Sequence, residues 1–147
     1  PHWLKKQYSR VANKYIPMTG NKVLLDTNII SALLKGEADV AGKIDKAAEV
    51  NIPIIVVGEL YYGAHYSTRI EKNINAIEKL TATYNVISHT NQTAKIYGSI
   101  KAQLRKKGTP IPENDIWIAA IAQQHNLTLI TRDKHFREIE GITIRKW

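Results

Sequence analysis

A short apolar run that ends in an acid is the feature that most constrains the fold of this chain. Val23-Leu24-Leu25 is followed directly by Asp26, and Thr27-Asn28 lead into a second apolar run that can begin a helix. An uninterrupted apolar run of this length is typical of a parallel strand covered on both faces. Because ligands of open α/β sheets bind at the carboxyl ends of the strands, Asp26 is placed where such folds carry out chemistry. In the alternative interpretation, Asp26 is simply the N-cap of the following helix.

The rest of the chain predicts strands that alternate with helices. Strands are expected at residues 22–26, 52–57, 84–88, 127–131 and 142–144. Helices are expected at residues 28–34, 38–50, 69–83, 91–107 and 113–125, with further helical turns after Gly58 and around Phe136. Strands joined through helices indicate right-handed parallel crossovers, so the sequence predicts an α/β fold with five strands.

Composition limits the classes of protein that this chain can belong to. A length of 147 residues fits one domain. The chain has no cysteine, which excludes a disulfide framework and a thiolate metal site. No apolar run approaches the roughly 20 residues of a membrane span. These features predict a soluble cytoplasmic protein that does not act at a membrane.

Basic residues gather in two parts of the chain, which has a net charge of +8. Residues 1–20 contain bases but no acid, and we interpret them as a basic extension ahead of a single domain of residues 21–147, with Met18 as the natural start. No acid lies between Glu78 and Glu113. A one-sided basic stretch is typical of a surface that binds a polyanion, although a solvated helix face is the alternative. The bases in the second interval are Lys79, Lys95, Lys101, Arg105, Lys106 and Lys107.

Four acids are notable for their positions in the predicted elements. Asp26, Glu59 and Asp133 each follow a predicted strand, and Asp115 lies in the first turn of a predicted helix. Parallel strands bring such positions to one edge, where the carboxylates would repel one another unless a cation neutralised them. An all-oxygen ligand set favours Mg²⁺ or Mn²⁺ over zinc, and such a site can activate water for attack at phosphorus. Taken singly, Asp115 could serve the helix dipole and Asp133 a cap.

Four segments in this order carry a family pattern: Leu24–Asn28, Val57–Gly63, Pro112–Ala122 and Leu129–Phe136. Together they resemble the PIN-domain ribonucleases, most closely the VapC toxins of bacterial and archaeal toxin–antitoxin pairs. The resemblance covers residues 22–147 and implies a PIN-like three-layer α/β/α sandwich with a central, mainly parallel five-stranded sheet. It also implies that the catalytic, metal-binding residues are Asp26, Glu59, Asp115 and Asp133.

The resemblance suggests supporting roles for other residues. The side chains expected to hold the ligands in place or contact phosphate are Thr27, Asn28, Asn114 and Thr131. The candidates for RNA backbone contacts are Lys101, Arg105, Lys106, Lys107 and Lys134. Tyr61, Tyr62 and Trp117 could stack on bases, with core or dimer packing as the alternative. Glu113 departs from the family pattern and is either an outer ligand or an acid that favours the helix start.

The function implied by the resemblance is a Mg²⁺- or Mn²⁺-dependent endoribonuclease that cuts tRNA, rRNA or mRNA and leaves a 5′ phosphate. It further implies a homodimer and a VapB-type antitoxin that blocks the acidic cleft, with the apolar face near Tyr61, Tyr62 and Ile70 as a docking surface. One alternative is a PIN fold that binds RNA or protein without catalysis. A receiver-like phosphotransfer domain is disfavoured because Thr27 and Asn28 stand where it needs a second acid.

Overall fold

The computed structural model describes residues 21–147, and the predicted extension of residues 1–20 lies outside this range. A short 3₁₀ helix, Lys134–Glu138, follows the fourth strand. The strands are β1 (Lys22–Leu25), β2 (Glu49–Pro53), β3 (Asn85–Ile87), β4 (Thr128–Ile130) and β5 (Thr143–Arg145). The α-helices are α2 (Thr27–Leu34), α3 (Ala38–Lys46), α4 (Ile54–His65), α5 (Ile70–Thr83), α6 (Asn91–Lys107) and α7 (Glu113–His125).

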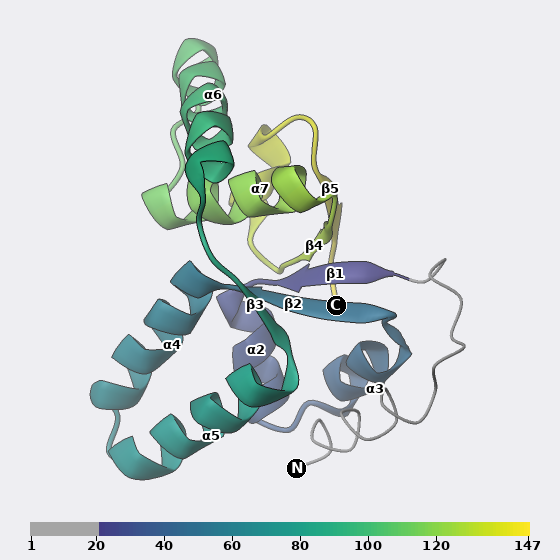
Figure 1. Cartoon of the computed structure of the whole chain (residues 1–147), viewed down its shortest axis with the longest axis vertical. Coiled ribbons are helices and arrows are strands. Elements are labelled where there is room, and N and C mark those ends of the chain that lie inside the picture. The colour runs from purple at the N-terminus through teal and green to yellow at the C-terminus, as the bar shows by residue number, and fades with distance from the viewer. Residues whose placement is uncertain (1–20) are drawn as a thin grey trace.

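The five strands form one parallel sheet in the order β3-β2-β1-β4-β5. In Figure 1, α2 to α5 lie on one side of β1 and β2, and α6 and α7 lie on the other. This arrangement confirms the predicted α/β fold. The chain builds the sheet outward from β1 in one direction through β2 and β3, and then returns to add β4 and β5 on the other side. The gap between the carboxyl ends of β1 and β4 is therefore a topological switch point, where such sheets bind ligands.

The core is deepest around β1 and α7. Leu24 and Leu25 of β1 are fully buried. In α7 the run Ile118–Ala122 is buried on every side, because the helix packs against α6, α4 and β4. A helix that is apolar all round is expected in such an interior position. The first turn of α7 is thus held rigidly beside the switch point.

The predictions for the second strand and its neighbours are wrong. Residues 54–57 were expected to continue a strand, whereas β2 ends at Pro53 and α4 begins at Ile54. The predicted helix at 38–50 is too long, since α3 ends at Lys46 and β2 already begins at Glu49. Val56, Val57, Leu60 and Ala64 are buried at helical spacing, so the β-branched run packs as one face of α4. Burial here overrides the strand preference of valine and isoleucine.

This boundary changes the position of one candidate. Glu59 does not follow a strand but lies in the second turn of α4. It reaches the sheet edge from the side of the helix that also carries Ile55 and Tyr62, one turn away in each direction.

Helix α6 has well-formed ends. Thr90 and Thr93 form a capping box at its start, and the helix ends at Gly108, whose φ of 70° suits a residue without a side chain. Its last turn contains Arg105, Lys106 and Lys107, all exposed. Cations at this end also favour the helix dipole, so part of the basic stretch has a structural reason to be basic. Among residues 21–147 no helix has the length and apolarity that crossing a bilayer requires.

Candidate acidic active site

Asp26 lies at the switch point and is 5% exposed. Its Oδ1 accepts a hydrogen bond from the Thr27 backbone N–H at 2.7 Å, which confirms that it is the N-cap of α2. Its Oδ2 accepts from the Thr131 hydroxyl at 2.7 Å, so the residues that directly follow β1 and β4 are joined. Burial raises the pKa of Asp26, while the hydrogen bonds from Thr131 and Thr27 act in the opposite direction. The same carboxylate therefore caps a helix and stands among the acids.

Asp115 and Asp133 approach each other across the switch point, with His135 between them. The His135 Nδ1 atom lies 3.0 Å from Asp133 Oδ1 and 3.4 Å from Asp115 Oδ2. Ligand atoms of these three side chains all lie within 4.8 Å of one another. The backbone N–H of His135 donates to Asp133 Oδ1 at 2.9 Å, so Asp133 also caps the 3₁₀ helix as the alternative interpretation proposed.

The electrostatics of Asp115 set it apart from the other acids. Its Oδ2 atom is buried and has no hydrogen-bond partner of normal geometry among residues 21–147. Burial, followed by the negative charges of Asp133 and Asp26, raises the pKa of Asp115 to about 6, and His135 offsets only part of this. A buried carboxylate beside other negative charges lacks a compensating positive charge.

Glu59 joins the site through neutral side chains. Its Oε2 atom accepts from the Thr27 hydroxyl at 2.5 Å, and its Oε1 atom accepts from the Asn114 amide at 3.0 Å. Its charge contributes to raising the pKa of Asp26. Glu59 thus lies at the acidic edge but outside the group formed by Asp115, Asp133 and His135. We use "acidic site" below for Asp26, Glu59, Asp115 and Asp133.

The supporting residues expected from the sequence all touch the acidic site. Thr27, Asn114 and Thr131 make the contacts given above. Asn28 donates from Nδ2 to Asp26 Oδ2 at 3.3 Å, and its Oδ1 accepts from the backbone N–H of Arg132 at 3.2 Å. These neutral donors fix the acids without supplying a charge. The structure leaves their roles as predictions.

Sequence reasoning missed His135. The available signal was its position two residues after Asp133, at the start of a helical turn, which lets both side chains point to one place. The tight turn of the 3₁₀ helix is what makes that spacing effective.

Glu113, in contrast, points away from the acidic site. It pairs with Lys101 and accepts a hydrogen bond from Tyr97, and these two partners lower its pKa. Lys101 of α6 therefore already has an ionic partner in Glu113 of α7. Trp117 stacks against His89 at 4.6 Å and Tyr97 at 4.0 Å between ring centroids, which favours packing over stacking on bases.

The remaining candidates for RNA contacts differ in whether a hydrogen bond already holds their side chains. Lys107 donates to the Glu138 carbonyl at 3.0 Å. Arg105, Lys106 and Lys134 are exposed.

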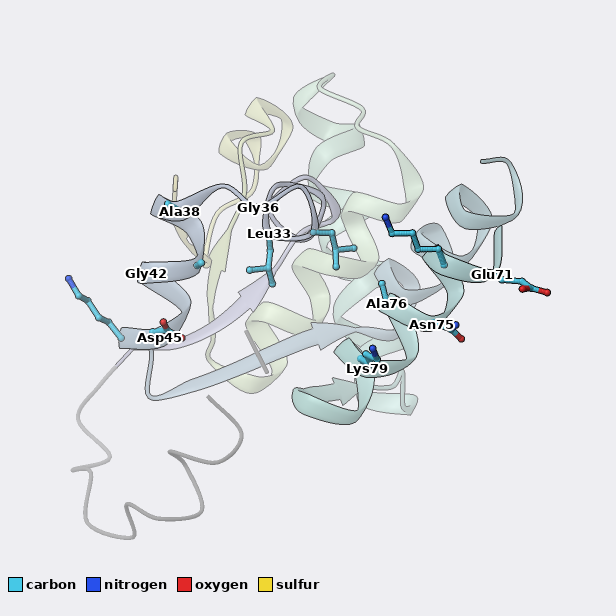
Figure 2. A pocket seen from close by; sticks show the side chains of 13 residues that line it. Leu33, Gly36, Ala38, Gly42, Asp45, Glu71, Asn75, Ala76 and Lys79 are labelled. Carbon is cyan, nitrogen blue, oxygen red and sulfur yellow. The ribbon is translucent and has the colours of Figure 1, made fainter. Parts of the chain in front are cut away.

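One hollow opens beside the acidic site, and a second groove lies elsewhere on the helices. A hollow of about 610 Å³ runs from Glu59 and Thr27 to Tyr62, which is 71% exposed. A larger groove, of about 1210 Å³, lies between α2 and α3 on one side and α5 on the other (Figure 2). Leu33, Leu34 and Ala76 form part of its lining, and Glu71 and Lys79 lie on the α5 side. It contains no member of the acidic site, so it suits binding rather than hydrolysis.

Comparison with known proteins decides the family. The model of the PIN domain matches residues 23–142, and curated VapC ribonucleases match nearly their whole length at 30% identity or more. This chain belongs to the VapC ribonucleases of the PIN-domain family. Ribonuclease VapC2 of Haemophilus influenzae is 33% identical, over 86% of this chain and 98% of that protein. The tRNA(fMet)-specific endonuclease VapC of Salmonella typhimurium is 31% identical with the same coverage.

The solved structures agree. The structure of DNA-bound VapBC from Salmonella typhimurium matches with a TM-score of 0.81 and 31% identity, over 86% of this chain and 98% of that one. The predicted PIN fold and the predicted class, a VapC-type ribonuclease toxin, are confirmed.

Proposed function

We propose that this VapC-type chain is an endoribonuclease that uses Mg²⁺ or Mn²⁺, held at the acidic site, to hydrolyse RNA phosphodiester bonds in the cytoplasm. The observation that carries the proposal is the buried Asp115 Oδ2 atom, which has no hydrogen-bond partner of normal geometry among residues 21–147 and lies beside two further carboxylates.

The residues present fit a hard divalent cation. Asp26, Asp115 and Asp133 offer carboxylate oxygens, which are the ligands that Mg²⁺ and Mn²⁺ favour. Asp115 and Asp133 would hold the ion most directly, and Asp26 and Glu59 would complete the negative surroundings. When bound, such a cation supplies Lewis-acid stabilisation of the negative charge that develops at phosphorus.

The protein's own residues position the acids. Thr131 and the Thr27 backbone hold Asp26 in one orientation, and the side chains of Thr27 and Asn114 hold Glu59. Preorganisation of this kind lowers the cost of assembling a charged site during the reaction. The carboxylates not bound to a cation can orient a water molecule for in-line attack, which leaves a 5′ phosphate.

The RNA would be held by exposed basic side chains. Arg105, Lys106 and Lys134 are exposed candidates for contacts to phosphate, whereas Lys101 and Lys107 already have partners. A relative cuts tRNA(fMet), and we propose a structured RNA such as a tRNA as the substrate here.

Cleavage of total bacterial RNA by the purified chain tests the proposal. With Mg²⁺ or Mn²⁺ we expect discrete fragments carrying 5′ phosphates, and with EDTA we expect none. The cleavage rate should also fall steeply as the salt concentration is raised. Protein contacts to RNA phosphates release bound counterions, and added salt therefore weakens RNA binding. Binding of RNA without cleavage under either cation would favour the alternative of a non-catalytic RNA-binding module.

The relatives also suggest which proteins this chain binds. Solved relatives are complexes of VapB and VapC, and we propose that this chain forms a homodimer and binds a VapB-type antitoxin. The groove between α2, α3 and α5 has an apolar lining with mixed charges at its edges, which suits an amphipathic helix.

Leu34→Lys is expected to weaken antitoxin binding about tenfold, because a charge would be buried on the groove lining when the partner binds. Leu34 is 37% exposed, so the fold should tolerate the change. Calorimetric titration with the cognate VapB-type antitoxin gives the affinity, and Leu34→Met is the matched control. RNA cleavage should be unchanged, and light scattering should give twice the chain mass of 16.6 kDa for every variant. Equal antitoxin affinities for all three proteins would place the partner elsewhere.

A further inference from the structure

Among the described residues, His135 is the member of the possible metal-ligand group at the acidic site that is not a carboxylate. It is just over half exposed, so the core does not require it. Its Nδ1 atom nevertheless points between Asp115 and Asp133 instead of into solvent. Packing in the core therefore does not account for the position of this side chain, and its contacts with the two acids do.

The distances from His135 Nδ1 to the two carboxylate oxygens match the spacing of neighbouring ligand atoms in an octahedral metal site. In an octahedral site with bonds of about 2.1 Å, neighbouring ligand atoms stand roughly 3.0 Å apart. The distances from His135 Nδ1 to Asp133 Oδ1 and Asp115 Oδ2 are 3.0 and 3.4 Å. An ion that touched both carboxylates would therefore also come within reach of the imidazole nitrogen.

A nitrogen ligand discriminates between cations. Mg²⁺ binds oxygen and retains its waters, whereas first-row transition cations accept imidazole readily. The geometry points to His135 as a specificity-determining metal ligand, which makes the site prefer Mn²⁺ over Mg²⁺. This inference rests on the proposed function and answers the question of cation identity that the carboxylates alone leave open.

Pulsed electron paramagnetic resonance of Mn²⁺ bound to the full chain tests the inference directly. At pH 8, where free imidazole is neutral, we expect bound Mn²⁺ to show coupling to a ¹⁴N nucleus in the wild type, and we expect His135→Gln to abolish it. In calorimetric titrations the same variant should bind Mn²⁺ about tenfold more weakly while its Mg²⁺ affinity stays within about twofold.

His125→Gln is the matched control. His125 is exposed and lies at the far end of α7, about 15 Å along the helix from Asp115, so both readouts should be those of the wild type. Bound Mn²⁺ without ¹⁴N coupling would overturn the ligand role of His135 and leave the proposed nuclease intact. Equal strengthening of Mn²⁺ and Mg²⁺ binding in His135→Gln would also overturn it, since that result describes a competing cation. Absence of any Mn²⁺ binding would overturn both this inference and the proposed function.

Discussion

Asp115→Asn is expected to lower the rate of RNA cleavage by about 10²- to 10³-fold, the size of effect seen when a group that stabilises the transition state is removed. The substitution keeps the shape of the side chain and removes its charge. Asp115 is the acid whose buried oxygen has no hydrogen-bond partner of normal geometry among the described residues. Its negative charge therefore contributes less to holding the fold together than the charges of the other acids. Single-turnover cleavage of one purified RNA with saturating Mn²⁺ measures the rate.

Glu113→Gln is the matched control for this experiment. It removes a carboxylate from the same first turn of α7, but one that pairs with Lys101 outside the acidic site. We expect its cleavage rate to stay within about threefold of the wild type, as for a surface ion pair. Comparable losses in both variants would mean that the negative charge at the start of α7 acts in general and that Asp115 has no special role.

The cation-free protein is expected to resist unfolding better at pH 5 than at pH 7.5. The pKa of Asp115 is raised from 3.8 to about 6 in the folded chain. The folded carboxyl therefore holds its proton more tightly than the unfolded one. Its ionised form destabilises the fold above pH 6, and this destabilisation is relieved as the pH falls through about 6 toward 3.8. Burial raises the pKa of Asp26 in the same direction.

Asp115→Asn should remove most of this pH dependence. At about 1.4 kcal/mol per pKa unit, the variant should gain roughly 3 kcal/mol in free energy of unfolding at pH 7.5 without added cation. Urea titrations in EDTA at both pH values give these free energies. Millimolar Mn²⁺ should stabilise the wild type by mass action and leave the variant nearly unchanged.

Glu113→Gln again provides the contrast, because the pKa of Glu113 is lowered by Lys101 and Tyr97. Its removal should cost a little stability, the opposite sign from Asp115→Asn. A variant Asp115→Asn that is no more stable than the wild type at pH 7.5 would show that this carboxylate is already compensated in the absence of a cation.

The parts of the fold and site that could be predicted are those with a local signal. Asp26 directly follows an apolar strand, and Asp115 lies in the first turn of α7, whose bounds match the prediction. Asp133 caps the short helix after β4. For each of these residues the neighbours in sequence determine both the element and the edge to which the side chain belongs.

The parts that could not be predicted depend on distant partners. The run Ile54–Val57 has strand propensity, and only its packing in the folded core makes it helical. Glu59 was therefore placed at the correct edge for the wrong reason. The pairing of Lys101 with Glu113 needs α6 and α7 to lie side by side, and the position of His135 needs a 3₁₀ turn. Neither condition can be seen in a stretch of neighbouring residues.

The hydrogen bond from Thr131 to Asp26 joins residues 105 positions apart and has a consequence for biosynthesis. A ribosome makes the N-terminal part first, at about 5–20 residues per second. While β4 is still unmade, β1 lacks its neighbour on that side, Asp26 lacks its buried donor, and Asp133 does not yet exist. A nascent chain that already displays α2 and α4 therefore cannot assemble the acidic site. Under the proposed mechanism, we expect the chain to acquire nuclease activity only when its synthesis is nearly finished.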